Sequence, residues 1–314
     1  MPDKIIQNGF TLIELSIVLV IVGLIAAGVI LGQDLISAAA MRAQISQINN
    51  YSSAVHSFQL KYNYLPGDMP DPYATQFGFL PRATGRGNGD GNGIIEGNSD
   101  NGTGTGCFGC SQEGESIIFW RDLSTAQLID GKFNTAAQND VTIETPGSVP
   151  SLSAFYPDAR VRQGNYIYVW SGGWAGVNGG GDGKNYFGIA GVFTRASGVF
   201  LTYTALTVQQ AYYIDSKADD GLPMTGRITA QYVGGNFSQA WAAGGQTLVG
   251  FSYTSHMGPA DPNNGPIVAG DGVSAPLDTR SCYDNGSTPG GSTHYSMASP
   301  TPANQNCTLS FQFQ

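Results

Sequence analysis

The strongest constraint on the fold is an apolar stretch near the N-terminus that is long enough to cross a membrane. Residues 10–32 contain one charged side chain, Glu14, and the next charge along the chain is Asp34. As an α-helix this stretch would extend about 34 Å, compared with roughly 30 Å for the hydrocarbon core of a bilayer. A carboxylate in such a segment is costly in lipid, so we expect Glu14 to have a function and a partner.

The residues around Glu14 resemble the type IV prepilin signature. That signature is a short polar leader ending in glycine, followed by Phe-Thr-Leu-Ile-Glu and an apolar helix. In this chain Gly9 ends the leader, Phe10 begins the apolar part, and Glu14 is its fifth residue. The resemblance covers about the first 30 residues and is highly specific. An ordinary signal anchor with a chance glutamate is the alternative interpretation.

In that family a membrane peptidase cuts the precursor after the glycine and methylates the new N-terminal amine. The resemblance therefore implies cleavage between Gly9 and Phe10, N-methylation of Phe10, and entry of the subunit into a helical filament. It also implies a partner for Glu14, the N-terminal ammonium of a neighbouring subunit. The physics agrees, because a carboxylate inside a dry bundle of helices is tolerable only when it is paired.

The composition and charge indicate a polar, loop-rich head with no electrostatic footprint for nucleic acid. Charged residues are 12% of the chain, about half the usual share, and the chain has 44 glycines. The formal net charge is −9, whereas nucleic-acid-binding proteins present a basic face. Lys4 in the leader agrees with a cytoplasmic N-terminus, which would place everything after the apolar stretch on the exported side.

The helix is expected to continue beyond the apolar stretch as an amphipathic helix. Seven side chains recur every three or four residues on one face, and residues such as Gln44 and Gln47 lie off that stripe. The sequence Leu65-Pro66-Gly67 then ends the helix. We predict a leader at 1–9, a transmembrane half-helix at 10–32, an amphipathic half at 33–63 and a head at 64–314. The stripe comprises Met41, Ile45, Ile48, Ser52, Val55, Phe58 and Tyr62.

The head is predicted to combine two helices with a mainly antiparallel sheet, which gives an α+β, pilin-like fold. The helices are expected at 113–129 and 207–217, where helical periodicity is bounded by start and stop signals. Alternating patterns predict strands at 166–170, 186–193, 199–203, 228–233, 248–253 and 307–313.

Four cysteines in an exported head suggest disulfides, and three pairings are open. Cys282 and Cys307 enclose a stretch rich in glycine, serine and proline, so their pairing is attractive. It also resembles the disulfide-closed C-terminal loop of many pilins. Cys107 and Cys110 would then close locally or cross-pair. A zinc site would need a second close pair of cysteines, and the sequence contains none.

Residues 88–99 follow the ligand spacing of an EF-hand-type calcium loop. Oxygen-bearing side chains occupy positions 1, 3 and 5, glycine occupies position 6, and a main-chain carbonyl serves position 7. Only Asp90 is charged among the first three, and position 12 is not glutamate, so Glu96 or Asp100 would have to substitute. We expect affinity near 10⁻⁴–10⁻³ M; a glycine- and asparagine-rich turn without an ion is the alternative. The candidate ligands are Asn88, Asp90, Asn92, Ile94 and Glu96.

The remaining candidate sites give no basis for catalysis, and an enzyme is not predicted. Asp215, Asp219 and Asp220 form a second acidic cluster, which a solvated turn or a cation would explain. The glycine-rich run at 172–183 lacks the Gly-Lys-Ser/Thr ending of a phosphate-binding loop. The three histidines are scattered, without a nucleophile or metal-ligand spacing beside them: His56, His256 and His294.

The sequence therefore predicts a structural filament subunit of a type IV pilus or type II secretion system. Its expected partners are other pilin or pseudopilin subunits, the prepilin peptidase and an assembly platform in the inner membrane. We expect a single-pass inner-membrane protein with a cytoplasmic N-terminus and a periplasmic head, which reaches the periplasmic or cell-surface filament after assembly. The alternative is a minor tip subunit whose large head acts as an adhesin or cargo-binding module.

Overall fold

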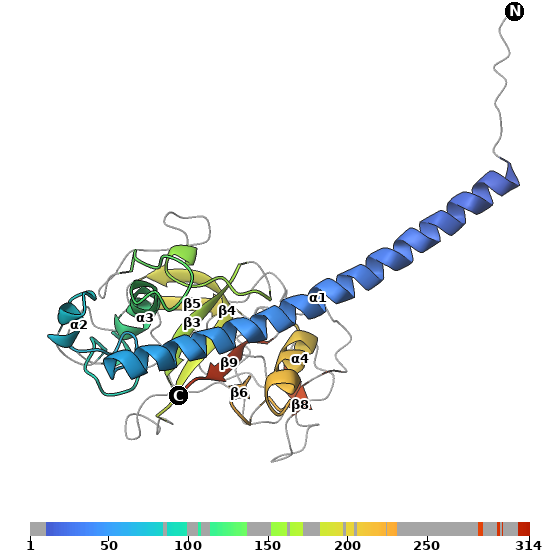
Figure 1. Cartoon of the computed structure of the whole chain (residues 1–314). Coiled ribbons are helices and arrows are strands. Elements are labelled where there is room, and N and C mark those ends of the chain that lie inside the picture. The colour runs from blue at the N-terminus through green and yellow to red at the C-terminus, as the bar shows by residue number, and fades with distance from the viewer. Residues whose placement is uncertain are drawn as a thin grey trace, which may run out of the picture.

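The computed structural model describes fourteen parts of the chain, and all structural statements below concern these residues. One long helix leaves a head built from a small antiparallel sheet, shorter helices and loops (Figure 1). The described residues are 11–83, 87–98, 106–107, 114–136, 152–161, 164–171, 183–196, 199–203, 206–223, 225–230, 282–284, 294–295, 297 and 307–314.

The long helix α1 spans Leu12–Tyr62 and confirms the predicted continuous helix. Thr11 caps its N-terminus in a capping box with Glu14, so both unpaired main-chain donors there find oxygen acceptors. Asn63 ends the helix with φ of 66°, in the left-handed region that asparagine tolerates better than most residues. The first part of α1 projects away from the head, and the second part lies along it (Figure 1).

Burial along α1 changes as the sequence pattern predicts. Residues 11–31 are all exposed, and the buried face begins at Met41 and continues to Tyr62. Gln44 is an exception to the prediction, because it lies on the buried face with no exposed surface. Its Oε1 accepts a hydrogen bond from the Val161 amide at 3.1 Å, and the neighbouring Gln47 donates to the carbonyl of Asp158 at 2.9 Å. Two glutamines thus fasten the helix to the turn at 158–161.

The central sheet contains five antiparallel strands: β3 (Asn165–Ser171), β4 (Asn185–Ala196), β5 (Val199–Tyr203), β6 (Ile228–Thr229) and β9 (Leu309–Gln312). Its order is β3-β4-β9-β6, and β5 pairs with the second half of β4. Tyr168 lies opposite Gly188 in the β3–β4 pair, and a Cβ at Gly188 would collide with the tyrosine ring. Glycine is therefore needed at this position of an otherwise bulky strand.

Four of the predicted strands are confirmed, β5 with the predicted bounds and the other three with different bounds. β3, β4 and β5 match the predictions at 166–170, 186–193 and 199–203, and β4 runs three residues further, to Ala196, because it forms a hairpin with β5. The prediction at 307–313 corresponds to β9. Of the prediction at 228–233, β6 covers Ile228–Thr229 and residues 231–233 lie outside the described residues. The prediction at 248–253 also lies outside them.

Both predicted head helices are present. α3 spans Gly114–Thr125, and α4 spans Val208–Ala218 with Thr207 and Gln210 forming its capping box. The sequence pattern did not indicate a short helix α2 (Tyr73–Gln76), a 3-10 turn η1 (Leu152–Ala154) or two hairpins of very short strands. These hairpins pair β1 (Gly97–Asn98) with β2 (Gly106–Cys107) and β7 (Tyr283–Asp284) with β8 (His294–Tyr295).

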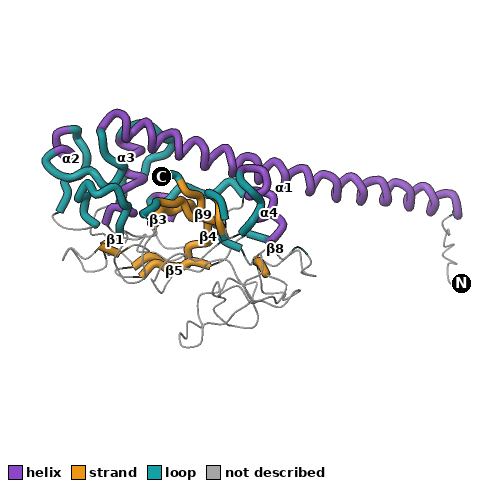
Figure 2. The backbone as a smooth tube through the Cα atoms, turned by 90° about the horizontal axis from the view of Figure 1, so that it is seen from below, coloured by secondary structure: helices purple, strands orange, loops and turns teal. Residues whose placement is uncertain are grey.

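The core lies where α1, α3 and the sheet meet, and aromatic rings fill its centre. Trp120 of α3 contacts Tyr51 of α1 edge-on at 4.9 Å and stacks on Phe187 of β4 at 5.8 Å between centroids. Phe187 in turn contacts Phe313 at 4.3 Å. Such ring pairs contribute about 0.5–1.5 kcal/mol each beyond their area burial. Figure 2 shows α1 and the sheet as separate layers with α3 at one end.

A buried ion pair holds the segment after α1 to helix α3. The Arg82 guanidinium donates to Asp122 Oδ2 at 2.6 Å, and both side chains are almost fully buried. Arg82 also donates to the carbonyls of Met69 and Leu80, while the same Asp122 oxygen accepts the Gly67 amide at 2.7 Å. The pair therefore fixes the 67–82 segment, which contains Asp68 of the acidic site in the head that is described below.

Candidate functional site

The N-terminal end of α1 presents Glu14 beside its own helix cap. Glu14 Oε2 accepts hydrogen bonds from the Thr11 amide at 2.8 Å and from the Thr11 hydroxyl at 2.7 Å. The hydroxyl oxygen accepts the Glu14 amide at 3.3 Å in return. Both bonds reach one oxygen, so within the described part of the chain Oε1 keeps its capacity for a further donor. Gly9 and Phe10 lie outside the described residues, so the cleavage and methylation positions stay predictions.

The helix that follows Glu14 exposes an apolar surface on all sides. Leu12, Leu19 and Leu24 are each at least 70% exposed. The other large apolar side chains of this part of the helix are each more than half exposed. In the part of the chain that the structure describes, α1 is the one helix long and apolar enough to cross a membrane. This finding fits a single-pass membrane anchor.

A second site lies in the head, where the loop at 87–96 wraps around two buried carboxylates. The glycines at 87, 89, 91 and 93 all have φ between +72° and +84°, which L-side chains rarely adopt. Alternating these with ordinary residues points successive main-chain N–H groups to one side, an arrangement that binds anions. Here the anions are carboxylates of the protein itself.

Asp68 receives three of these amides. Its Oδ1 accepts hydrogen bonds from Gly91 at 2.8 Å and Asn92 at 3.2 Å, and its Oδ2 accepts one from Gly93 at 2.9 Å. Asp68 is 1% exposed and follows the Pro66-Gly67 turn that ends α1. Gly67 has φ of +86°, and a Cβ there would collide with the main-chain oxygen of Glu115. The turn after α1 thus brings Asp68 against the start of α3.

Glu115 receives the amides on the other side of the loop. Its Oε1 accepts hydrogen bonds from Gly89 at 2.8 Å and Asp90 at 3.4 Å, and its Oε2 accepts one from Glu96 at 2.9 Å. The residue lies in the first turn of α3, where a helix stabilises a negative charge. Its side chain is fully buried.

The amide hydrogen bonds lower the pKa of both carboxyl groups, but burial has the larger, opposite effect and raises it. Loss of solvation raises the pKa of Asp68 to about 7, and the Asp90 charge adds to the rise. Loss of solvation also raises the pKa of Glu115 well above its ordinary value, with Asp68 as the next cause. A bound cation would relieve the repulsion between the two carboxylates.

Three carboxylates meet at this loop with one oxygen each within 4.8 Å of the others: Asp68, Asp90 and Glu115. Asp90 is exposed and carries the third charge. Oxygen donors of this kind, with flexible spacing, are what Ca²⁺ prefers. Asp90 comes from the predicted loop, Asp68 from the turn after α1 and Glu115 from the first turn of α3.

The other predicted ligands take part in hydrogen bonds within the loop or lie buried in it. Asn92 Oδ1 accepts the Ile94 amide at 2.7 Å, and Asp90 Oδ1 accepts the Asn92 amide at 3.1 Å. Asn88 and Glu96 are fully buried. Of the two predicted ligands that have a carboxylate, Asp90 and Glu96, Asp90 belongs to the cluster of three carboxylates that the described residues form.

Sequence reasoning missed Asp68 and Glu115. Asp68 follows the Pro66-Gly67 stop of the long helix, and Glu115 lies near the start of the helix predicted at 113–129, so neither position indicates a metal ligand. One signal could have pointed to them, because charged residues are only 12% of the chain and each of these two lies close to a large apolar side chain: Met69 follows Asp68, and Ile117 is two residues after Glu115. Their meeting with Asp90 depends on how three separate segments pack, which the local pattern does not contain.

The second acidic cluster binds its own backbone and one tyrosine. Asp215 is buried in α4 and accepts the Tyr295 hydroxyl at 2.8 Å and the Gly221 amide at 3.1 Å. Asp219 accepts the Ile228 amide at 2.8 Å, and Asp220 organises the turn after it. Loss of solvation raises the pKa of Asp215 to about 7. The cluster thus ties α4 to β6 and to the β7–β8 hairpin.

A disulfide closes the segment that carries Tyr295. Cys282 and Cys307 are bonded, as predicted, and both are fully buried. Cys107 lies in β2, and Cys110 lies outside the described residues, so the second pairing stays a prediction. The histidines give no cluster in the described part: His56 is exposed on α1, His294 is exposed on β8, and His256 is outside it.

Comparison with known proteins gives one match. Residues 6–30 match the family model described as the prokaryotic N-terminal methylation motif, which is the type IV prepilin-like signature. No curated protein and no solved structure matches the chain at a significant level. The matched segment contains Gly9, Phe10 and Glu14, and it supports a type IV pilin- or pseudopilin-like precursor, a structural subunit. The head, from residue 64 onward, lies outside the match.

Proposed function

We propose that the chain is a filament subunit of a type IV pilus or a type II secretion system. The observation that carries the proposal is the exposed apolar half of α1, which directly follows the methylation motif and begins with Glu14. In the membrane this half spans the bilayer, with the leader in the cytoplasm and the head in the periplasm. After cleavage behind Gly9 it leaves the lipid and packs among the same helices of neighbouring subunits.

Assembly explains why so much apolar surface is exposed in a single subunit. From Leu12 to Ile36 the helix presents large aliphatic side chains in all directions, more than half exposed in almost every case. Contiguous patches of this size mark surfaces that lipid or another protein covers. Within a filament of such helices, Glu14 would meet the N-terminal ammonium of a neighbour, and its free Oε1 is available for that contact.

Co-purification with sheared filaments tests this function. The full chain, expressed in a host with the peptidase and assembly platform, should appear in the filament fraction, and it should remain in the inner membrane when the platform is deleted. A chain that stays in the membrane in both strains would contradict the proposal. The copy number per filament decides between roles: hundreds indicate a major subunit, and a few indicate the alternative, a tip subunit acting as adhesin or cargo-binding module.

We also propose that the head binds Ca²⁺ between Asp68, Asp90 and Glu115. Three carboxylate oxygens within 4.8 Å offer hard ligands, and two of these carboxyl groups are buried, where a cation would relieve the repulsion between them. Asn88, Asn92, Ile94 and Glu96 remain the candidate sources of further oxygens. Because metal ligands must be deprotonated, binding should strengthen as pH rises through about 7, where Asp68 ionises.

Thermal unfolding of the full chain in detergent micelles, with and without Ca²⁺, tests the metal site. Ca²⁺ at ten times its Kd should add about 1.4 kcal/mol to the free energy of unfolding and so raise Tm. Asp90→Asn should remove this increase. Asp130→Asn is the matched control, because Asp130 is also exposed but lies outside the cluster. Equal Tm and equal protease resistance with and without Ca²⁺ would exclude the site.

A further inference from the structure

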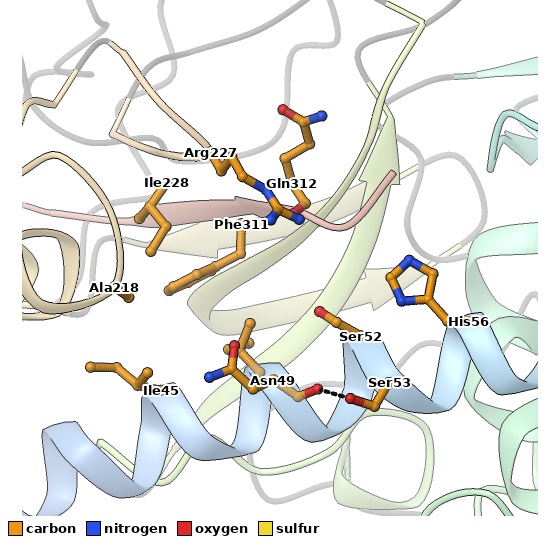
Figure 3. A pocket seen from close by; sticks show the side chains of 11 residues that line it. Ile45, Asn49, Ser52, Ser53, His56, Ala218, Arg227, Ile228, Phe311 and Gln312 are labelled. Carbon is orange, nitrogen blue, oxygen red and sulfur yellow. Dashed lines mark hydrogen bonds between the residues drawn. The ribbon is translucent and has the colours of Figure 1, made fainter.

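A groove runs between α1 and the sheet edge formed by β6 and β9 (Figure 3). Its volume is about 350 Å³, within the range of small-molecule binding sites. The floor is apolar, because Ile48 of α1, Ile228 of β6 and Phe311 of β9 line it and are each no more than 5% exposed. The groove is separate from the membrane end and from the acidic loop.

Polar groups stand on both walls of this groove. Asn49, Ser52 and His56 lie along one side of α1, and Arg227 lies opposite them (Figure 3). The side chain of Gln312 points away from the groove, where its Oε1 accepts a hydrogen bond from Lys184 Nζ at 3.1 Å. The Arg227 guanidinium donates to the main-chain oxygen of Gln312 at 3.3 Å, which holds it at the rim. The guanidinium has five N–H donors, so most of them remain for a ligand.

The charge of the groove is opposite to that of the whole molecule. The chain has 23 acidic and 14 basic residues, yet none of the described residues lining the groove is acidic. Arg227 is exposed at its rim. An anion in the groove would therefore face the Arg227 cation, while the Asp219 carboxylate beside this cation accepts the main-chain amides of Arg227 and Ile228.

We propose that the groove binds a carboxylate-bearing sugar of the hexuronate class. The carboxylate would bind the planar Arg227 fork, which matches its two oxygens. The side-chain amide of Asn49 and the hydroxyl of Ser52, which both line the groove, donate and accept hydrogen bonds, as sugar hydroxyls do. The sugar ring would lie over the small exposed parts of Phe311, Ile48 and Ile228. This proposal does not depend on which filament the chain enters.

Binding of free glucuronate to the full chain in detergent micelles tests the proposal by ligand-observed NMR. A ligand of this size should bind with a Kd on the order of 1–10 mM. Glucose lacks the carboxylate and cyclohexanecarboxylate lacks the hydroxyls, so each should bind at least about tenfold more weakly. Glucuronate that binds no better than both analogues, or that shows no saturable binding, would overturn the proposal.

Two variants locate the binding. Arg227→Gln removes the charge-assisted hydrogen bonds and should weaken glucuronate binding about tenfold or more. Asn49→Asp places a like charge on the exposed opposite wall, which leaves the core untouched, and should weaken binding similarly. Lys132→Gln, at an exposed site outside the groove, is the matched control and should bind as the wild type does. Unchanged affinity in both groove variants would overturn the assignment.

Discussion

Thr11 and Glu14 bind each other reciprocally at the start of α1. The glutamate carboxylate accepts both the amide and the hydroxyl of Thr11, and the threonine hydroxyl accepts the Glu14 amide. The residue that the prepilin resemblance assigns to a contact between subunits therefore also caps its own helix. Loss of Glu14 should have two separable effects, one on the helix end and one on assembly.

Replacement of these two residues should separate capping from assembly. Thr11→Ala removes the capping hydroxyl, which costs about 0.5–2 kcal/mol of local helix stability, but it keeps the carboxylate. Glu14→Ala removes the carboxylate and keeps the capping hydroxyl of Thr11. We expect both precursors to be cleaved, and we expect filaments to be lost with Glu14→Ala and largely retained with Thr11→Ala. Electron microscopy of filament number and length provides the measurement, and normal Glu14→Ala filaments would refute the ion-pair role.

The buried pair of Arg82 and Asp122 should be sensitive to loss of one partner. Arg82→Met leaves the Asp122 carboxylate buried without its cation, so we expect a loss of about 3–5 kcal/mol in the free energy of unfolding. Adding Asp122→Asn to this variant should restore part of the loss, because the buried charge disappears. Arg160→Met, at an exposed arginine, is the control and should cost less than about 1 kcal/mol. Denaturant unfolding in detergent would disprove the role if Arg82→Met behaved like this control.

Asp215 should make stability fall as pH rises. Its folded pKa of about 7 lies above the ordinary value of 3.8, so between these values the folded state holds a proton that the unfolded state has released. Its stabilising contribution is complete below pH 4 and is lost as pH rises through about 7. Relative to Asp215→Asn, we expect the wild type to lose about 1–2 kcal/mol between pH 5 and pH 8. Parallel Tm profiles for the two proteins over this range would rule out the linkage.

The sequence predicted those elements whose signals are local. The bounds of α1 followed from one apolar run, one amphipathic stripe and the Pro66-Gly67 stop, and the observed helix ends at Tyr62. Strand β9 followed from simple alternation of apolar and polar residues. The buried Gln44 was not predictable, because its partner is a main-chain amide in a turn more than 100 residues away.

The candidate site in the head shows the same limit. The glycine and oxygen spacing at 88–99 predicts a calcium loop, with a turn without an ion as the alternative, and the calcium stays a prediction. The pattern could not reveal that its amides bind Asp68 and Glu115, because these residues arrive from the end of α1 and the start of α3. Likewise, Asp215 and Tyr295 meet only because α4 and a distant hairpin pack together.

The most direct test of the account is the mass of the N-terminus in cells that contain the prepilin peptidase. Intact-mass spectrometry of the chain purified from membranes should show a protein that begins at Phe10 and carries a methyl group on its amine. Gly9→Ala, or deletion of the peptidase, should leave the full precursor with residues 1–9. A wild-type chain that keeps its leader, or that starts at another residue, in peptidase-containing cells would contradict the central claim.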